Sequence, residues 1–322
     1  MGEIPCKKRR RVGPVLCYTA AELNMDPSRN ANAKISFGCK KLDSRFGGGI
    51  PLVGITEIAG EAGCGKTQFC LQLALQAHLP QEHGGCNGRS LYLSCGEGQV
   101  PFGRLRQLAR AYEKKYEISE ESFLDSVLTL KVNNVEEQLQ VVLKDLDQLV
   151  PSRNLKLVII DSIAGLMRTD FSNNIKQDRI DKYEATFLLG QKMKKLSSKY
   201  NVPFLVANQV SADFSQGGAS AARGQTANKA ALGLTWAACV TARYMLSKRE
   251  QGSFLGPGLD WGNGNQNPNA QASLATVDQL KKSYPQQPLK GTKRFISLKF
   301  APHLPRCTTE YFIEAEGIRS MF

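Results

Sequence analysis

The chain has 322 residues, of which 42 are Lys or Arg and 29 are Asp or Glu, so its formal net charge is +13. A hydrophobic content of 42% is enough for a large core, and no apolar run has the length of a membrane-spanning helix. The nine cysteines include no C-x-x-C pair, which favours reduced thiols over disulfides or structural zinc. The basic balance favours a polyanionic partner such as nucleic acid, although solubility alone could account for part of it.

Residues 1–34 are predicted to form a basic, flexible arm outside the folded domain, because they are polar and rich in Asn. Five consecutive cations, Lys7 to Arg11, have the character of a nuclear import signal; a solvated or DNA-contacting tail is the alternative. We therefore expect the protein in the nucleus. Residues 35–322 are expected to form one ATPase domain.

The stretch GEAGCGKT at residues 60–67 matches the phosphate-binding loop pattern G-x-x-x-x-G-K-[ST]. An apolar, β-branched run precedes it, and a run without Pro or Gly follows it, as the strand and helix around such a loop require. Lys66 is expected to reach the β- and γ-phosphates, and the Thr67 hydroxyl to ligate Mg²⁺. The sequence therefore predicts an ATP and Mg²⁺ site, with nucleotide contacts from Gly60, Glu61, Ala62, Gly63, Cys64, Gly65, Lys66 and Thr67.

Strands and helices alternate along the next part of the chain. Apolar runs predict strands at 90–94, 127–132, 155–161 and 202–210. Helical spacing predicts helices at 102–116, 134–149 and 175–200. In the last of these, the residues expected to face the core are Ile180, Tyr183, Phe187, Met193 and Leu196. This alternation predicts an α/β fold with a doubly wound, mainly parallel sheet.

Polar side chains end two of these predicted strands. Asp161 follows four apolar residues in the Walker B arrangement, which places a carboxylate beside Mg²⁺; an ordinary strand-end cap is the alternative. Asn208 and Gln209 end the run at 202–210. The carboxyl ends of parallel strands face one crevice, so we expect these groups near the nucleotide.

The remaining chain is less regular. Residues 211–229 are rich in Ser, Gly and Ala and predict a mobile loop, and 236–246 predict a β segment. Residues 248–293 are rich in Gly, Asn, Gln and Pro, which predicts a disordered insertion. Alternation returns at 294–300 and 310–315, where antiparallel strands are expected to close the sheet.

The order of these motifs resembles the RecA-like recombinases, and among them the eukaryotic strand-exchange recombinases. The segments that carry the resemblance are ISFGCKKLD at 35–43, GGIP at 48–51, ITEIAG at 55–60, GKTQ at 65–68, VIIDS at 158–162, RTDF at 168–171 and ANQV at 207–210. The similarity runs from about residue 15 to the C-terminus, the insertion excepted. LGLTWAACV at 232–240 and APHLP at 301–305 resemble one DNA-repair paralogue of the family, particularly its plant form.

The resemblance implies an ATP-bound mediator of homologous-recombination repair of DNA double-strand breaks. The implied partners are single-stranded DNA, recombination intermediates, another recombinase paralogue and the strand-exchange recombinase, in a hetero-oligomer. By this resemblance, Asp161 supports the metal, and Gln209 senses the γ-phosphate and links it to two DNA loops. The first loop follows Arg168, and the second spans residues 211–229. These loops offer cations for phosphates and aromatic rings for bases: Arg168, Phe171, Phe214, Arg223 and Lys229.

Two departures from the family pattern concern hydrolysis and assembly. The family's water-activating Glu usually lies four residues after a Tyr such as Tyr92, where this chain has Gly96, so Glu97 is our candidate general base. Two functions remain open, a weak DNA-stimulated ATPase and a non-hydrolysing, ATP-bound scaffold. A P-loop helicase or kinase is a weaker alternative. We expect the arm alone to stand in place of the small helical N-terminal domain of the family.

The arm contains Tyr18-Thr19-Ala20-Ala21, which resembles the aromatic-x-x-Ala segment of the strand-exchange recombinases. In that family the segment adds to the edge of a neighbouring subunit's sheet and places its ring in a pocket. The resemblance therefore implies that Tyr18 and Ala21 dock onto a partner paralogue, with backbone pairing for affinity and two pockets for specificity. A linker with an incidental tyrosine is the alternative.

Overall fold

The computed structural model describes residues 33–96, 99–172, 175–212, 228–250 and 292–321. The strands are β1 (Lys34–Ile35), β2 (Ile50–Pro51), β3 (Ile55–Gly60), β4 (Arg89–Cys95), β5 (Val127–Val132), β6 (Leu155–Asp161), β7 (Phe204–Ala212), β8 (Asn228–Ala230), β9 (Ala242–Glu250), β10 (Thr292–Phe300), β11 (Thr308–Glu314) and β12 (Gly317–Arg319). The helices are α2 (Lys40–Arg45), α3 (Lys66–Gln76), η2 (Gln81–His83), α4 (Phe102–Tyr116), α5 (Glu120–Asp125), α6 (Val135–Gln140), η3 (Val141–Asp145), α7 (Leu146–Ser152), α8 (Ile163–Thr169), α9 (Lys176–Tyr200) and α10 (Gly233–Cys239).

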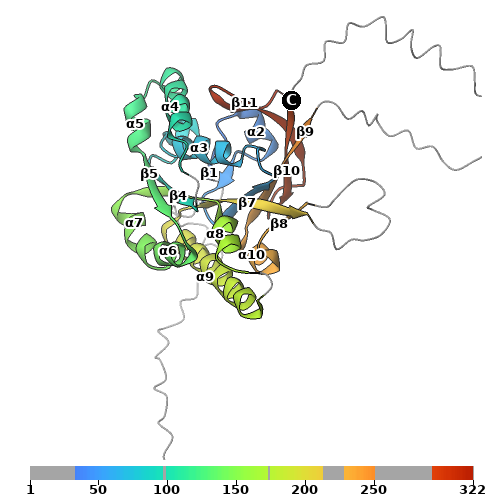
Figure 1. Ribbon diagram of the computed structural model, residues 1–322. Helices are drawn as coiled ribbons and strands as arrows, with labels where there is room; N and C mark the ends of the chain where they lie inside the picture. The colour runs from blue at the N-terminus through green and yellow to red at the C-terminus, as the bar shows by residue number, and fades with distance from the viewer. Residues whose placement is uncertain (1–32, 97–98, 173–174, 213–227, 251–291, 322) are drawn as a thin grey trace, which may run out of the picture.

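One large sheet runs through the molecule in the order β12-β11-β10-β9-β3-β7-β6-β4-β5, with β8 paired to β7 (Figure 1). The strands from β9 to β5 are parallel to their neighbours, whereas β10, β11, β12 and β8 pair antiparallel. The predicted doubly wound, mainly parallel sheet with antiparallel C-terminal strands is therefore confirmed.

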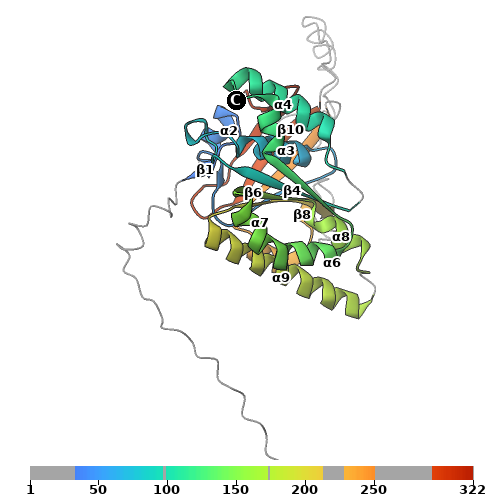
Figure 2. The same cartoon turned by 90° about the vertical axis from the view of Figure 1, so that its left-hand side faces the viewer.

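Helices cover both faces of the sheet. Figure 2 shows α2, α3 and α4 on one face and α6, α7, α8 and α9 on the other. Each face has its own hydrophobic cluster, one built on α3, α4 and the aromatic rings of Phe37, Phe69 and Tyr244, the other on α7 to α10. β3 and β6 are buried along almost their whole length, as expected of parallel strands covered on both faces. Among the described helices, none combines the length and apolarity needed to cross a bilayer.

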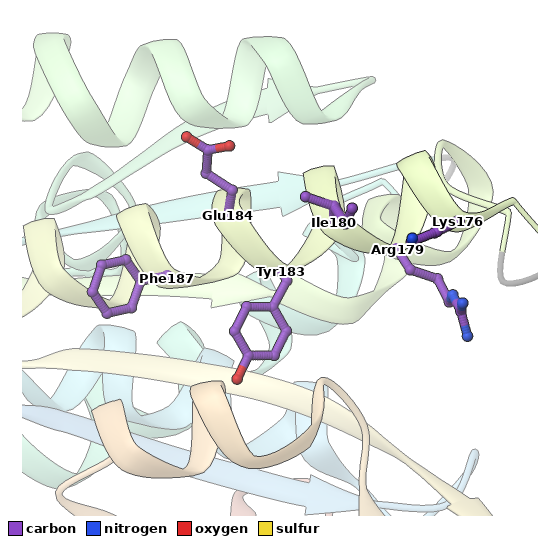
Figure 3. A pocket seen from close by; sticks show the side chains of 6 residues that line it. All are labelled: Lys176, Arg179, Ile180, Tyr183, Glu184 and Phe187. Atoms are coloured by element: carbon purple, nitrogen blue, oxygen red, sulfur yellow. The ribbon is translucent and has the colours of Figure 1, made fainter.

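Helix α9 differs from its prediction in which side chains it buries. Met193 and Leu196 lie in the core as expected, but Ile180, Tyr183 and Phe187 are exposed at 49%, 61% and 44%. Figure 3 shows these three side chains along α9, with Lys176 and Arg179 toward its N-terminal end. Apolar spacing identifies a helix but cannot tell how much of it the sheet covers. The N-terminal half of α9 thus has an apolar exposed side.

Three predicted boundaries in the C-terminal third were wrong. The segment 236–246 was expected to be all strand, but it contains most of α10, and β9 begins only at Ala242. The predicted insertion at 248–293 is shorter, because β9 continues to Glu250 and β10 begins at Thr292. The predicted loop at 211–229 also loses its ends to β7 and β8. In each case, pairing with a distant strand extends an element beyond its local signal.

The arm boundary also shifts slightly. Lys34 pairs with Pro51 between β1 and β2, so the folded part begins at least one residue earlier than residue 35. At the start of α6, Asn134 caps the helix, since its Oδ1 accepts a hydrogen bond from the Glu137 backbone N–H at 2.8 Å.

Two helical glycines provide a test of the α9–α10 contact. A Cβ at Gly190 of α9 would lie 2.4 Å from Cys239 Sγ and 2.8 Å from Cys239 Cβ, whereas a Cβ at Gly103 of α4 would meet nothing within 4 Å. We expect Gly103→Ala to raise the free energy of unfolding by about 0.5–1 kcal/mol through helix propensity. Gly190→Ala should lower it by about 1–3 kcal/mol through overpacking. Urea denaturation of both variants checks this, and equal shifts would contradict the close contact.

Candidate nucleotide-binding site

The phosphate-binding loop joins β3 to α3 and takes the conformation that its glycines allow. Gly65 has a φ of +100°, and a Cβ there would lie 2.7 Å from Ile313 Cδ1 of β11. At Gly60, a Cβ would lie 2.7 Å from the Leu246 carbonyl oxygen of β9. A side chain at either position would therefore push the loop away from the strands that support it.

Lys66 begins α3 and turns back over the loop. Its Nζ donates to the carbonyl oxygens of Gly60 and Glu61, each at 2.8 Å. Burial lowers the pKa of the Lys66 ammonium below its usual value, an effect that Asp161 partly opposes. The N-terminus of an eleven-residue helix and a lysine at the same point form a cradle suited to phosphate.

Asp161 lies at the end of β6, opposite the first turn of α3. Its Oδ2 accepts hydrogen bonds from the Thr67 hydroxyl at 2.7 Å and from the Tyr92 hydroxyl at 2.6 Å. Burial raises the pKa of Tyr92 well above its usual range, so this hydroxyl remains a donor. A threonine hydroxyl and a carboxylate are the oxygen ligands that Mg²⁺ takes beside bound phosphates.

Gln209 lies at the level of the phosphate loop. In the register of the sheet it pairs with Gly60 of β3, while Asp161 pairs with Ala207 two residues earlier on β7. The Gln209 side chain is exposed, and its Oε1 accepts a hydrogen bond from the Arg168 guanidinium of α8. Sequence-predicted residues from four separate segments thus meet at one edge of the sheet.

A cavity of about 800 Å³ opens in front of these groups. Its lining includes Thr67, Tyr92, Ser94, Gly96, Lys131, Asn133, Asp161, Ser162, Arg168, Asp170 and Gln209. A space of this size is in the range of ligand sites and accommodates a nucleotide. With its cradle for phosphates and its oxygen ligands for a cation, the site fits a nucleotide and Mg²⁺.

Not every predicted site residue joins this cavity. Phe171, proposed to stack on bases, is partly buried and packs against the hydrophobic cluster of α7 to α10. Lys229 lies in β8, and only its backbone is described. Glu97, Phe214, Arg223, Tyr18 and Ala21 lie outside the described residues.

Tyr92 was not identified as a site residue from the sequence. It pairs with Ile159 between β4 and β6, so it lies on the same side of the sheet as Asp161, two residues further along β6. The apolar run of β4 gave no indication of a role, because only its pairing with β6 brings the phenol to the carboxylate. The order of the strands is the signal that could have found it.

Gly96 directly follows β4, at the position where the resembled family usually has its water-activating Glu. Its φ is +88°, and its N–H donates to the Val132 carbonyl oxygen at 2.9 Å. A glutamate at this position would have to adopt a backbone conformation that side chains disfavour. The backbone conformation at position 96 therefore favours glycine.

Comparison with known proteins gives consistent matches over most of the chain. The family model described as Rad51 matches residues 28–253. The DNA repair protein XRCC3 homolog of Arabidopsis thaliana is 32% identical over 305 residues, covering 89% of this chain and 93% of that protein. DNA repair protein XRCC3 of Bos taurus is 31% identical over 301 residues, covering 92% and 77%. DNA repair protein RAD51 homolog 2 of Mus musculus is 31% identical over 255 residues, covering 72% and 73%.

The loop lysine provides the test of the site. We expect Lys66→Ala to weaken ATP binding by about thirtyfold, because it removes a charge-assisted contact to phosphate of about 2 kcal/mol. The fold should persist, since the ammonium contacts only loop carbonyls. Titration with a fluorescent ATP analogue measures the affinity, and Lys40→Ala on the exposed start of α2 is the matched control. Equal ATP affinity in both variants would contradict the assignment.

Proposed function

Because the chain belongs to the Rad51 family, we propose that it is an ATP-binding mediator of homologous-recombination repair that acts on single-stranded DNA with other recombinase paralogues. The family expected from the motifs is confirmed, and so is the likeness to one repair paralogue, XRCC3. The observation that carries the proposal is the meeting of Thr67, Asp161 and Gln209 at one cavity, directly beside the loop lysine Lys66. A phosphate loop beside the exposed Gln209 amide suits a protein whose nucleotide state alters another contact.

ATP is the nucleotide expected of the family, and Mg²⁺ is our proposal for the metal. The loop backbone and Lys66 would hold the phosphates, while Thr67 and Asp161 would ligate the cation. Mg²⁺ would supply neutralisation of phosphate charge. The Tyr92 hydroxyl would keep the Asp161 carboxylate oriented, as hydrogen-bond partners behind metal ligands do.

Hydrolysis is the point at which two versions of the proposal differ. A weak DNA-stimulated ATPase requires a general base, for which Glu97 is the candidate. The glycine conformation at position 96 instead favours a chain that retains ATP as a structural element of a paralogue complex. We propose slow turnover, with the non-hydrolysing scaffold as the second candidate.

We propose DNA contacts from the two expected DNA loops, one before and one after Gln209 in the sequence. Arg168 lies in the last turn of α8, just before the first expected DNA loop, and its guanidinium already contacts the Gln209 amide. Arg223 and Lys229 belong to the second expected loop. Cations near a strand-end amide could pair with DNA phosphates without reading the base sequence, which suits single-stranded DNA.

The arm is proposed to provide the contact to a partner paralogue and the route into the nucleus. Tyr18 and Ala21 would add to a partner's sheet edge. This chain has an edge of that kind itself, since among the described strands β5 pairs only with β4. The basic run Lys7 to Arg11 would direct nuclear import, which deletion of the run and microscopy of the tagged protein would test.

The function is tested by ATP turnover with and without single-stranded DNA. We expect slow turnover that DNA stimulates, and loss of that stimulation in Glu97→Gln with ATP affinity unchanged, because a general base does not hold the nucleotide. Lys66→Ala is the control for contaminating ATPases. Turnover equal in all three proteins would contradict the ATPase and leave the scaffold. DNA affinity that does not change with ATP would contradict the mediator itself.

The docking role of the arm makes a separate prediction. Tyr18→Ala combined with Ala21→Glu should abolish co-purification with a partner paralogue, because it removes the ring and places a charge where the backbone must lie flat. ATP binding should be unchanged, since the loop is distant in sequence. Thr19→Ala is the matched control within the same segment. Retention of the partner by the double variant would show that the arm is a linker.

A further inference from the structure

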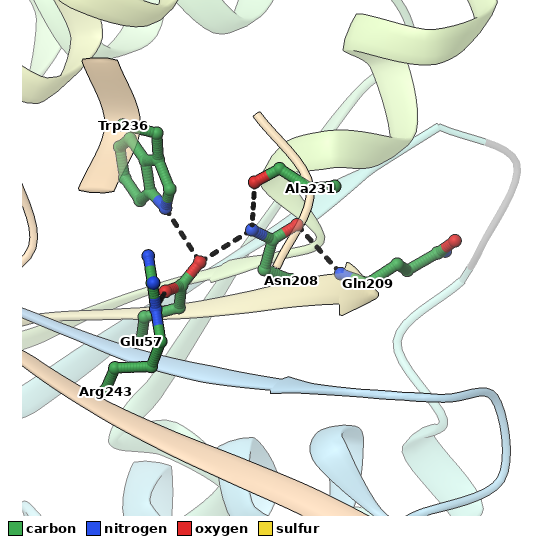
Figure 4. A network of polar contacts seen from close by, with 6 residues as sticks. All are labelled: Glu57, Asn208, Gln209, Ala231, Trp236 and Arg243. Atoms are coloured by element: carbon green, nitrogen blue, oxygen red, sulfur yellow. Dashed lines mark hydrogen bonds and ion pairs between the residues drawn. The ribbon is translucent and has the colours of Figure 1, made fainter. Parts of the chain in front are cut away.

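A buried carboxylate lies at the centre of the sheet, behind the nucleotide site. Glu57 of β3 is fully buried, and its Oε1 accepts hydrogen bonds from Asn208 Nδ2 at 2.6 Å and from Trp236 Nε1 at 2.8 Å (Figure 4). Its Oε2 forms an ion pair with Arg243 of β9. Three elements, β7, α10 and β9, therefore converge on one side chain of β3.

Stability does not explain this arrangement. Burying an ion pair costs desolvation that its attraction often fails to exceed, and apolar residues of the same volume commonly serve as well or better. The sheet around Glu57 is apolar, with Ile55, Ile58 and Val206 all fully buried. The polar group is therefore better explained by what it positions.

Glu57 determines which way the Asn208 amide faces. A carboxylate only accepts hydrogen bonds, so Asn208 must direct its Nδ2 toward Glu57 and its Oδ1 away from it. That Oδ1 accepts a hydrogen bond from the Gln209 backbone N–H at 2.8 Å. The same Nδ2 also donates to the Ala231 carbonyl oxygen at 3.0 Å. A reversed amide would break all three contacts.

Gln209 is consequently held from both sides of its backbone. Its N–H is bound by Asn208, and its carbonyl oxygen accepts from the Ala231 N–H at 2.9 Å. Ala231 lies directly after β8 and two residues before α10, which carries Trp236 back to Glu57. The contacts close a ring through Glu57, Asn208, Ala231 and Trp236. The Gln209 side chain is not part of this ring and is exposed in the cavity.

We infer that Glu57 is a positioning residue that couples the state of the Gln209 side chain to β8 and α10 through Asn208 and Trp236. The inference rests on the proposed function, in which ATP engages Gln209. A shift of the Gln209 backbone toward the cavity pulls on both the Asn208 amide and Ala231. The packed contact of α10 with Gly190 of α9 gives that motion a rigid element to act on.

Two double variants, both without charge at positions 57 and 243, distinguish a positioning role of Glu57 from a packing role. Glu57→Gln with Arg243→Met removes the ion pair but keeps an Oε1 that can accept from Asn208 and Trp236. Glu57→Leu with Arg243→Met has nearly the same volume and no acceptor. The methionine sulfur can replace the guanidinium that lies over the Phe300 ring, 5.2 Å from its centroid. The two variants therefore differ in one hydrogen-bonding group.

The first readout is the fluorescence of Trp236. The chain has two tryptophans, so Trp261→Phe in the whole 322-residue chain leaves Trp236 as the only tryptophan, which is excited selectively over the tyrosines. We expect ATP with Mg²⁺ to change its emission in this background and in the Gln–Met variant. In the Leu–Met variant the change should fall at least fivefold, while ATP affinity stays within about threefold. Equal responses in both variants, or no response in the Trp261→Phe chain, would overturn the inference.

The second readout uses Trp236→Phe in the otherwise unaltered chain, a change that keeps an aromatic ring and removes the indole N–H. The affinity for single-stranded DNA measured with ATP, divided by that measured with ADP, should fall by about fivefold. The DNA affinity measured with ADP should stay unchanged. An unchanged ratio would count against the coupling. If the unaltered chain binds DNA without regard to nucleotide, the proposed function fails, and the fluorescence response still decides the role of Glu57.

Discussion

The site depends on the register of three neighbouring parallel strands. β3 and β6 end at the same edge of the sheet, where their pairing with β7 places Gly60 beside Gln209 and Asp161 beside Ala207. Hydrogen bonds along buried strands leave little freedom for the chain to slip, because a shift of one residue would reverse every side chain. The phosphate loop, the metal carboxylate and the exposed amide therefore reach the cavity without any of them being held by a flexible segment.

The antiparallel C-terminal strands support the same edge from the other side. The Tyr311 hydroxyl of β11 donates to the Cys64 carbonyl oxygen in the phosphate loop, and Ile313 packs against Gly65. Arg104 of α4 also donates to the carbonyl oxygens of Glu314 and Ala315. The last strands of the chain thus hold a loop that lies some 250 residues earlier. In this member of the Rad51 family, the proposed nucleotide site is therefore supported by strands that lie far apart in the described chain.

Binding and hydrolysis have different structural requirements in this molecule. The groups that would hold phosphates and metal are complete, whereas the position at which the resembled family has its Glu is a glycine with a φ of +88°. Behind the cavity, the buried Glu57 orients Asn208 and through it the backbone of Gln209. We propose that such a site senses a nucleotide rather than turning it over rapidly, as a mediator that works beside other recombinases would.

The sequence by itself determined the phosphate loop, the Walker B aspartate, the strand-end amide and the alternation of strands and helices, because each depends on residues adjacent in the chain. It could not determine that Tyr92 contacts Asp161 or that Trp236 and Arg243 reach Glu57, since those contacts depend on which strands become neighbours. The sequence pattern also predicted wrongly that Ile180, Tyr183 and Phe187 of α9 face the core. Helical spacing reveals an apolar face, but only tertiary packing decides whether anything in the fold covers it.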